Sequence, residues 1–317
     1  MSILVTGSAG FIGTHLCEEL LKRGKKVIGI DSYITGSSLN TIYLKNIYSQ
    51  YTFYEGNICN LDDIKFLDNE NIIEIYHLAS LASPDKYQEF PLETMDVNIN
   101  GTLNMLKIAE KYSSKFLFTS TSEVYGDPLV HPQPESYYGN VNIIGPRSCY
   151  DESKRAGETY VDIFRKRNPN FFHFYKIVRI FNTYGPRMSL EDGRIITNFI
   201  KQILNNSPLN IYGSGKQTRS FCYVSDMVDG LIKMMKSTES GPINLGNPSC
   251  EFSLLELKEV FEKIVGKQLE VTHAIATKDD PQVRRPDITL AQTKLNFLPK
   301  VSLEEGIRMT FDFFTKK

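Results

Sequence analysis

The chain has 317 residues, and its 36 Lys and Arg residues nearly balance its 37 Asp and Glu residues, leaving a formal charge of -1. Hydrophobic residues make up 41% and charged residues 23%, which is close to soluble globular proteins and excludes wholesale disorder. The length predicts two lobes or one large α/β unit, and the near-neutral charge argues against duplex nucleic acid as a partner.

Short apolar runs in the first half of the chain predict five buried strands. They lie at Ile3–Thr6, Lys26–Asp31, Tyr51–Glu55, Ile72–His77 and Phe116–Ser120. Helical patterns lie between them, the clearest at Phe11–Lys22 and Thr94–Tyr112. The runs are unbroken rather than alternating, which indicates strands covered on both faces. This alternation of strands and helices predicts an α/β fold with a Rossmann-type, doubly wound parallel sheet.

Residues 127–149 are rich in proline and glycine and predict a loop too long to be a simple connection. A helix at Tyr150–Arg167 and a strand at Phe172–Phe181 are expected to follow it. The strict alternation then loosens. Four further helices are predicted, at Ile195–Leu204, Ser225–Lys236, Leu254–Val265 and Leu303–Phe314, and a strand at Leu209–Tyr212.

The five cysteines are odd in number and contain no CxxC pair, which favours free thiols in a reducing compartment over disulfides or a zinc ribbon. The N-terminus has no basic segment before its apolar run, so we do not expect a signal peptide. No stretch of about 18 uncharged apolar residues is present, so no membrane span is expected. These features predict a cytoplasmic protein without a membrane partner.

The first strand runs directly into a GxxGxxG turn formed by Gly7, Gly10 and Gly13. The first glycine would allow a tight turn, the second a close approach of the backbone to pyrophosphate, and the third close packing of helix on strand. The N-terminus of the following helix offers unpaired N–H groups to phosphate. Asp31 follows 18 residues after Gly13, where an acid binds a ribose 2′-hydroxyl and repels a 2′-phosphate. The pattern therefore favours NAD over NADP.

Tyr150 and Lys154 form a YxxxK pair, whose spacing puts both side chains on one helical face. A neighbouring ammonium stabilises a phenolate, so Tyr150 is a candidate general base. Thr121, Ser122 and Glu123 follow the fifth strand, at the sheet edge where open α/β sheets bind ligands.

Several long stretches identify a resemblance to the extended short-chain dehydrogenase/reductase family of nucleotide-sugar enzymes. They include VTGSAGFIGTHL (5–16), TSTSEVYGDP (119–128), GPRSCYDESKR (145–155), RIFNTYGPRM (179–188) and DDPQVRRPDIT (279–289). The resemblance covers essentially the whole chain and is closest to the UDP-glucuronate-decarboxylating branch. Dehydratases of the family carry an Asp-Glu pair after Thr121, and epimerases typically carry no glutamate there, whereas this chain has Ser122-Glu123.

The resemblance implies a role for individual residues. NAD would be held by Gly7, Gly10, Phe11, Ile12, Gly13, Asp31, Asn57, Ile58, Leu78, Ala79, Ser80, Asn98, Tyr150 and Lys154. The UDP-sugar would meet Asn182, Tyr212, Gln217, Arg219 and Arg284. Residues 1–181 and about 222–247 would form the NAD-binding domain, and residues 182–221 and 248–317 the UDP-sugar-binding lobe. A homodimer through the helices at 94–112 and 150–167 is expected in the same way.

The implied activity is the NAD-dependent decarboxylation of UDP-glucuronate to UDP-xylose and CO₂ through a 4-keto intermediate, with NAD regenerated in each cycle. Tyr150, Lys154, Thr121, Ser122, Glu123 and Arg284 would carry the chemistry, and no metal would be needed. Two alternatives remain open: a UDP-glucuronate 4-epimerase or related isomerase, and a nucleotide-sensing or scaffold protein that keeps the fold without catalysis.

Overall fold

The computed structural model describes residues 1–274 and 281–316. Its centre is a seven-stranded sheet in the order β11-β6-β5-β4-β1-β2-β3, in which every pairing is parallel. The strands are β1 (Ser2–Thr6), β2 (Val27–Asp31), β3 (Tyr51–Glu55), β4 (Ile72–His77), β5 (Lys115–Thr121), β6 (Tyr175–Ile180) and β11 (Ile243–Leu245). The chain reverses its direction across the sheet between β1 and β4, where open α/β sheets place their ligands. The predicted doubly wound parallel sheet is confirmed.

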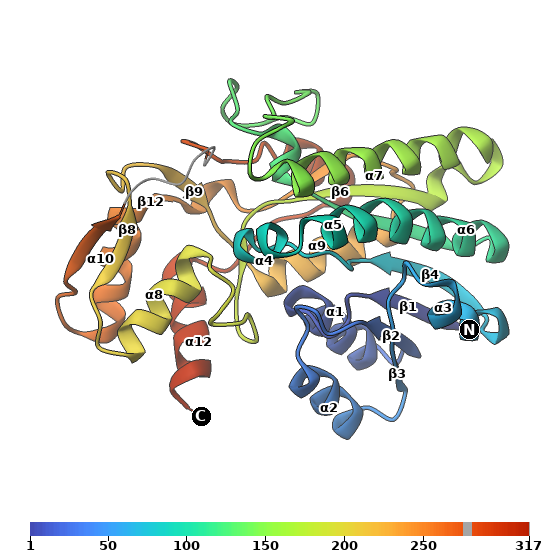
Figure 1. The fold of residues 1–317 in the computed structure, drawn as a ribbon, viewed down its shortest axis with the longest axis horizontal. Helices are drawn as coiled ribbons and strands as arrows, with labels where there is room; N and C mark the ends of the chain where they lie inside the picture. The colour runs from blue at the N-terminus through green and yellow to red at the C-terminus, as the bar shows by residue number, and fades with distance from the viewer. Residues whose placement is uncertain (275–280, 317) are drawn as a thin grey trace.

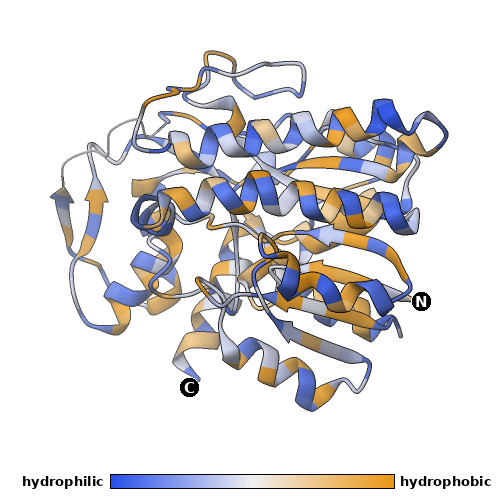
Figure 2. Ribbon diagram, turned by 45° about the vertical axis from the view of Figure 1, so that its right-hand side comes forward, coloured by the Kyte–Doolittle hydropathy of each residue, from blue (hydrophilic) through white to orange (hydrophobic). Residues whose placement is uncertain are grey.

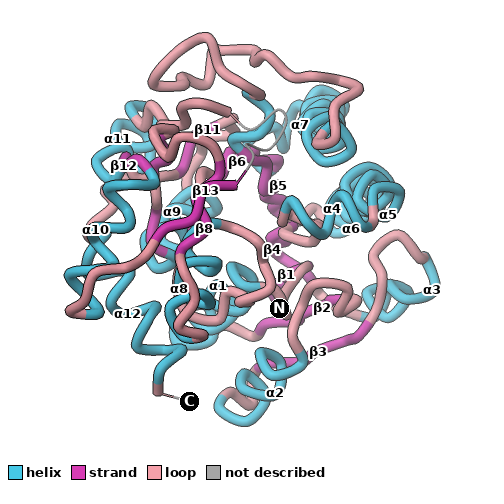
Figure 3. Tube along the Cα trace, turned by 60° about the vertical axis from the view of Figure 1, so that its left-hand side comes forward, coloured by secondary structure: helices cyan, strands magenta, loops and turns pink. Residues whose placement is uncertain are grey.

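Helices cover both faces of this sheet (Figure 3). One face carries α1 (Phe11–Lys22), α2 (Ser38–Ile47) and α9 (Val224–Lys236). The other carries α3 (Leu61–Ile64), α4 (Pro84–Glu89), α5 (Pro91–Asp96), α6 (Thr102–Tyr112) and α7 (Ser148–Arg167). Figure 2 shows apolar and polar residues alternating along these helices, as expected when one side packs on the sheet and the other meets solvent.

A smaller part, at the left of Figure 1, is built from short sheets and helices. Three two-stranded sheets pair β7 (Thr183–Tyr184) with β10 (Cys222–Tyr223), β8 (Leu209–Tyr212) with β13 (Val271–Ala274), and β9 (Thr218–Ser220) with β12 (Glu251–Ser253). Its helices are α8 (Ile195–Leu204), α10 (Leu254–Val265) and α12 (Leu303–Thr315), while α11 (Thr289–Leu295) packs back on α9 and β11.

Two predicted elements are corrected. The strand expected at Phe172–Phe181 is confined to Tyr175–Ile180. Pro169 begins a 3₁₀ helix over Pro169–Phe174, which includes the first residues of the predicted strand. The helix expected at Thr94–Tyr112 begins earlier, at Pro91, and contains a π-helical turn at Val97–Gly101 between α5 and α6. The predicted loop is confirmed, since no helix or strand is assigned between Tyr125 and Ser148.

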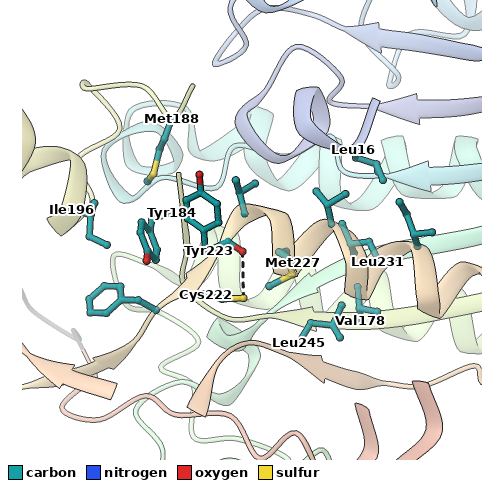
Figure 4. Packing of buried hydrophobic residues seen from close by; sticks show 14 of the residues in the cluster. Leu16, Val178, Tyr184, Met188, Ile196, Cys222, Tyr223, Met227, Leu231 and Leu245 are labelled. Carbon is teal, nitrogen blue, oxygen red and sulfur yellow. Dashed lines mark hydrogen bonds between the residues drawn. The ribbon is translucent and has the colours of Figure 1, made fainter. Parts of the chain in front are cut away.

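One hydrophobic cluster runs without a break from the large sheet into the smaller part. Figure 4 shows Leu16, Val178 and Leu231 at one end, and Tyr184, Met188 and Ile196 at the other. The two parts therefore share a core instead of meeting as separate bodies. All five cysteines are free, and three of them are buried.

Candidate active site

A cavity of about 1220 Å³ lies at the carboxyl edge of the sheet and continues into the smaller part. Of the predicted site residues, all but Asn98 line it. Residues of the glycine turn and the second strand form one end, Tyr150 and Glu123 the middle, and Tyr212 with Arg219 the other end. Asp279 and Asp280, in one of the stretches that carry the family resemblance, lie outside the described residues.

The glycine turn is packed so tightly that side chains do not fit. Gly7 has φ +70°, and a Cβ there would come within 2.8 Å of the Ala79 backbone nitrogen. A Cβ on Gly13 would overlap the carbonyl oxygen of Gly7. Helix α1 then begins at Phe11 with no side-chain cap, so its first N–H groups remain available at the cavity wall. This is the arrangement that binds a pyrophosphate.

Asp31 ends β2 beside this turn. Its carboxylate accepts hydrogen bonds from the backbone N–H groups of Ala9 at 3.0 Å and Tyr33 at 2.9 Å. Burial raises the pKa of Asp31, and these two donors oppose the rise. The carboxylate is thus fixed on the cavity wall as an acceptor for ribose hydroxyls. Ser80 lines the same wall, and its buried hydroxyl has no partner in the described structure, which fits a site built for a further polar group.

Tyr150 and Lys154 are both buried on helix α7, and the Lys154 ammonium lies 5.9 Å from the Tyr150 ring centre. The Lys154 Nζ donates a 2.9 Å hydrogen bond to the carbonyl oxygen of Thr119. Burial lowers the pKa of Lys154 to about 7 and raises the pKa of Tyr150, while a hydrogen bond with Thr121 opposes the rise at Tyr150. The chain's own groups therefore leave the phenol protonated, and the phenolate needs an additional positive charge nearby.

Glu123 carries a carboxylate that is 14% exposed and is held by two guanidinium groups. Arg284 makes two hydrogen bonds to it, one of them 2.7 Å from Nη2 to Oε2, and Arg147 makes a third from the other side. Burial would raise the pKa of Glu123, but the two arginines hold it well below its usual range. Arg284 comes from the far end of the chain, so this cluster joins the sheet edge to the smaller part.

Two arginines of the site were missed in the sequence analysis. Arg147 lies three residues before Tyr150, inside a stretch already noted for its resemblance. A charged residue at the end of the long predicted loop could have indicated it. Arg194 lines the cavity and pairs with Asp192, two residues earlier, through Nη2 and Oδ2 at 2.7 Å. Its charge favours the ionised form of Tyr150.

Asn98, which the resemblance places on the nicotinamide side, is the one predicted site residue that does not line the cavity. Asn98 is fully buried in the π-helical turn, and its Nδ2 donates a 2.9 Å hydrogen bond to Ser153 Oγ. It therefore links the turn to helix α7, one residue before Lys154, and does not reach the cavity wall. The π-helical turn changes which residues face the sheet, a shift that a regular 3.6-residue pattern does not reveal.

In the smaller part, Tyr212, Gln217 and Arg219 line the cavity together with Asn182. Gln217 Nε2 donates to the carbonyl oxygen of Tyr212 at 2.7 Å, and Arg219 is 8% exposed on strand β9. A planar guanidinium, an amide and an aromatic ring suit a nucleoside diphosphate. Among the described residues, no helix is long and apolar enough to cross a membrane, and no cluster of His, Cys, Asp or Glu has the makings of a metal site.

Comparison with known proteins agrees with this site. The profile of the NAD dependent epimerase/dehydratase family matches residues 3–246. "UDP-glucuronic acid decarboxylase 1" of Arabidopsis thaliana is 48% identical over 315 residues, covering 99% of this chain and 70% of that protein. The protein of the same name in Xenopus tropicalis is 44% identical, covering 99% of this chain and 72% of that protein.

Two solved structures have the same fold over the whole chain. UDP-glucose 4-epimerase from Thermotoga maritima, determined with UDP-glucose, has a TM-score of 0.90 at 30% identity and covers 100% of this chain and 99% of its own. UDP-glucuronic acid 4-epimerase from Bacillus cereus, determined with UDP-glucuronic acid and NAD, has a TM-score of 0.88 at 32% identity with the same coverage. The resemblance found in the sequence is confirmed, and this chain belongs to the NAD dependent epimerase/dehydratase family.

Proposed function

We propose that this protein is an NAD-dependent UDP-glucuronate decarboxylase that forms UDP-xylose and CO₂ through a 4-keto intermediate. The observation that carries the proposal is the 44–48% identity, over 99% of the chain, to proteins named UDP-glucuronic acid decarboxylase. The geometry supports it, because Tyr150, Lys154, Thr121 and the Glu123–Arg284 pair meet in one cavity that reaches the nucleotide-binding residues of both parts.

The first step needs a base at the sugar C4 hydroxyl, and Tyr150 is placed for it. When bound, NAD⁺ supplies the acceptor for the C4 hydride and returns that hydride at the end of the cycle. The charge of Arg194 favours the phenolate, and a protonated Lys154, 5.9 Å from the Tyr150 ring centre, would add to it. Tyr150 thereby holds the proton taken from the C4 oxygen until the last step.

Oxidation at C4 turns the sugar into a β-keto acid, which loses CO₂ and leaves an enolate on the C4 oxygen. Thr121 and Tyr150 stabilise this oxyanion by hydrogen bonding. Ser122, Glu123 and Arg284 orient the sugar and its carboxylate. The two arginines on Glu123 keep that carboxylate ionised, so Glu123 acts by position and charge and does not act as an acid.

A 4-epimerase is the second candidate, since both solved structures described above are 4-epimerases. It would use the same oxidation and return the hydride to the other face of the sugar. The decarboxylase is favoured by the named relatives and by Glu123 at the position where epimerases of the family typically lack a glutamate.

Mass spectrometry of UDP-glucuronate incubated with the pure protein and NAD tests the proposal. The expected product is a UDP-pentose lighter than the substrate by one CO₂. A product of unchanged mass and new retention time would establish the epimerase instead. If neither product forms, the assigned substrate is contradicted.

We also propose that the protein is a cytoplasmic homodimer with no nucleic acid or membrane partner. Helices α5, α6 and α7 lie side by side on one face of the sheet (Figure 1) and supply its contact surface. Leu92 on α5 is 78% exposed and Ile163 on α7 is 43% exposed, so these helices offer apolar side chains to a partner. The division into residues 1–181 with 222–247, and 182–221 with 248–317, remains a prediction.

A further inference from the structure

A second, smaller cavity lies behind the Glu123 cluster. It has a volume of about 380 Å³ and is lined by Glu123, Gly126, Asp127, Asn140, Val141, Asn142, Arg147, Asp151 and Pro281. Glu123 and Arg147 also line the large cavity, so these two side chains form the wall between the two spaces. Hereafter we call this second space the rear cavity.

The rear cavity leads from the surface to the wall formed by Glu123 and Arg147, on whose other side the reaction centre lies. At its outer end, Asp127, Asn140 and Asn142 are exposed to solvent. At its inner end, Arg147 and Asp151 are buried. A nucleotide ligand in the large cavity would bury most of its surface on the other side of this wall. The rear cavity thus reaches the Glu123 wall by a path that these ligands do not fill.

Asp151 is the unusual group at the inner end. It is 5% exposed, and its Oδ1 has no hydrogen-bond partner in the described structure. A buried carboxyl oxygen without a partner is costly, and it is normally found where a water or a ligand completes the arrangement. The cavity is polar and large enough for several water molecules.

Asp151 also carries a proton near neutral pH. Burial and the neighbouring charge of Glu123 raise its pKa to about 8, while Arg147 and Arg284 act in the opposite direction and Glu152 adds to the rise. Among the described residues, the other carboxyls that line the rear cavity are Asp127, at its exposed end, and Glu123. Glu123 holds no proton, because its two arginines keep its pKa low.

The proposed reaction needs a proton that the groups assigned so far do not provide. Loss of CO₂ leaves the bonding electron pair at C5 and the C4 oxygen, and a new C5–H bond consumes one proton from outside the substrate. The proton on Tyr150 came from the C4 hydroxyl and returns to the C4 oxygen when the ketone is reduced. The C5 proton must therefore come from another source, and over a full cycle it comes from solvent.

We propose that the rear cavity is the route by which solvent supplies the C5 proton, and that Asp151 is the positioning residue that holds the proton at its inner end. The proton passes from Asp151 through water to C5, the C5 electron pair forms the new bond, and the Asp151 carboxylate takes up a proton from solvent at the open end. This inference rests on the proposed decarboxylase function.

The test compares the wild-type protein with Asp151→Asn, and uses Glu152→Gln as the matched control. Glu152 is the next residue on the same helix, pairs with Arg155 and lines neither cavity. Three quantities are measured with UDP-glucuronate: CO₂ release, UDP-xylose formation, and the near-ultraviolet absorbance of bound NADH at steady state. The pH dependence of kcat is measured for each variant.

In Asp151→Asn we expect UDP-xylose formation to slow by about 100-fold, the lower end of what a positioned proton donor contributes. Bound NADH should rise, because the ketone cannot be reduced before C5 is protonated. Wild-type kcat should fall as the pH passes 8, where Asp151 loses its proton. The limb that belongs to Asp151 should be absent in Asp151→Asn. Glu152→Gln should keep this limb and move it only slightly to lower pH, because the Glu152 charge is the smallest of the influences named above on the pKa of Asp151.

A second variant, Val141→Phe, narrows the rear cavity without altering Asp151, and it should raise bound NADH in the same way. It keeps the test decisive if Asp151→Asn does not fold.

Wild-type rates and NADH levels in both variants would overturn the inference, as would slower turnover without a rise in NADH. If the wild-type protein releases no CO₂, the proposed function itself fails. If the wild-type protein releases CO₂ and the variants behave as it does, only this inference fails.

Discussion

Two opposing influences act on the protonation of Glu123. A carboxylate this deeply placed would take up a proton, yet two guanidinium groups keep it ionised and hold it still. One of its partners, Arg284, could be predicted from the sequence only through the family resemblance. The other, Arg147, sits in a loop where no periodic pattern marks a residue as buried.

Tyr150→Phe should reduce kcat by at least about 100-fold, because it removes the group that takes the C4 hydroxyl proton. Cofactor binding should survive, since the phenyl ring still stacks on Tyr87, whose ring centre lies 5.2 Å away. Turnover and the NAD content of the purified protein are the measurements.

The matched control for that variant is Tyr160→Phe, the same change on the same helix outside the cavity. It should behave as the wild type does. Unimpaired turnover in Tyr150→Phe would contradict the role given to the phenol.

The residue scale also marks the limit of sequence reasoning. Glycines and the YxxxK pair are recognisable because their chemistry depends on fixed spacing. Asn98 and Arg194 depend on how a helix is wound and how a loop is folded. The first lies in a π-helical turn and does not line the cavity, and the second lies on the cavity wall at the start of α8, paired with Asp192.

At the scale of elements, long segments with a strong pattern were predicted closely and short ones were not. Helices α1, α8 and α10 have the predicted bounds, and Ser253 caps α10 with a capping box formed with Glu256. The two- and three-residue strands of the smaller part were missed, because two or three residues are too few to show an alternating pattern. They exist through pairing with distant segments, such as β9 with β12.

Gly13→Ala tests the packing of helix α1 on strand β1. An added Cβ would meet the Gly7 backbone, which cannot move aside without opening the turn. We expect loss of NAD from the purified protein and a drop of several degrees in Tm, consistent with overpacking that costs about 1–3 kcal/mol.

Gly24→Ala is the control for backbone strain alone. Gly24 also ends up in an unusual conformation, with φ +72°, but a Cβ there meets nothing within 4 Å. It should lower Tm slightly and leave the NAD content unchanged. Equal NAD content in Gly13→Ala and the wild type would show that the turn tolerates a side chain.

At the scale of the whole molecule, the proposed dimer makes a direct prediction. Ile163→Glu places a charge on the exposed face of α7 and should convert the dimer to a monomer in light scattering coupled to size-exclusion chromatography. Leu298→Glu changes a side chain that is 53% exposed on a different surface and should leave the dimer intact. A wild-type protein of monomer mass would refute the proposal.

The order of the strands could be predicted only in part. Five strands and their parallel pairing follow from the pattern of the first half of the chain. The seventh strand, β11, has three residues and reaches the sheet after a long excursion through the smaller part. Its place beside β6 is decided by tertiary packing, which local sequence does not encode.

That excursion has a consequence for how proteins of this shape can change. Residues 222–245 return to the large sheet between two visits to the smaller part, and a single apolar core binds the two parts together. No single cut divides the chain into two pieces that each keep a complete core. The smaller part therefore cannot be exchanged between relatives as one continuous segment, and changes to the cavity wall must arise by substitutions made in place.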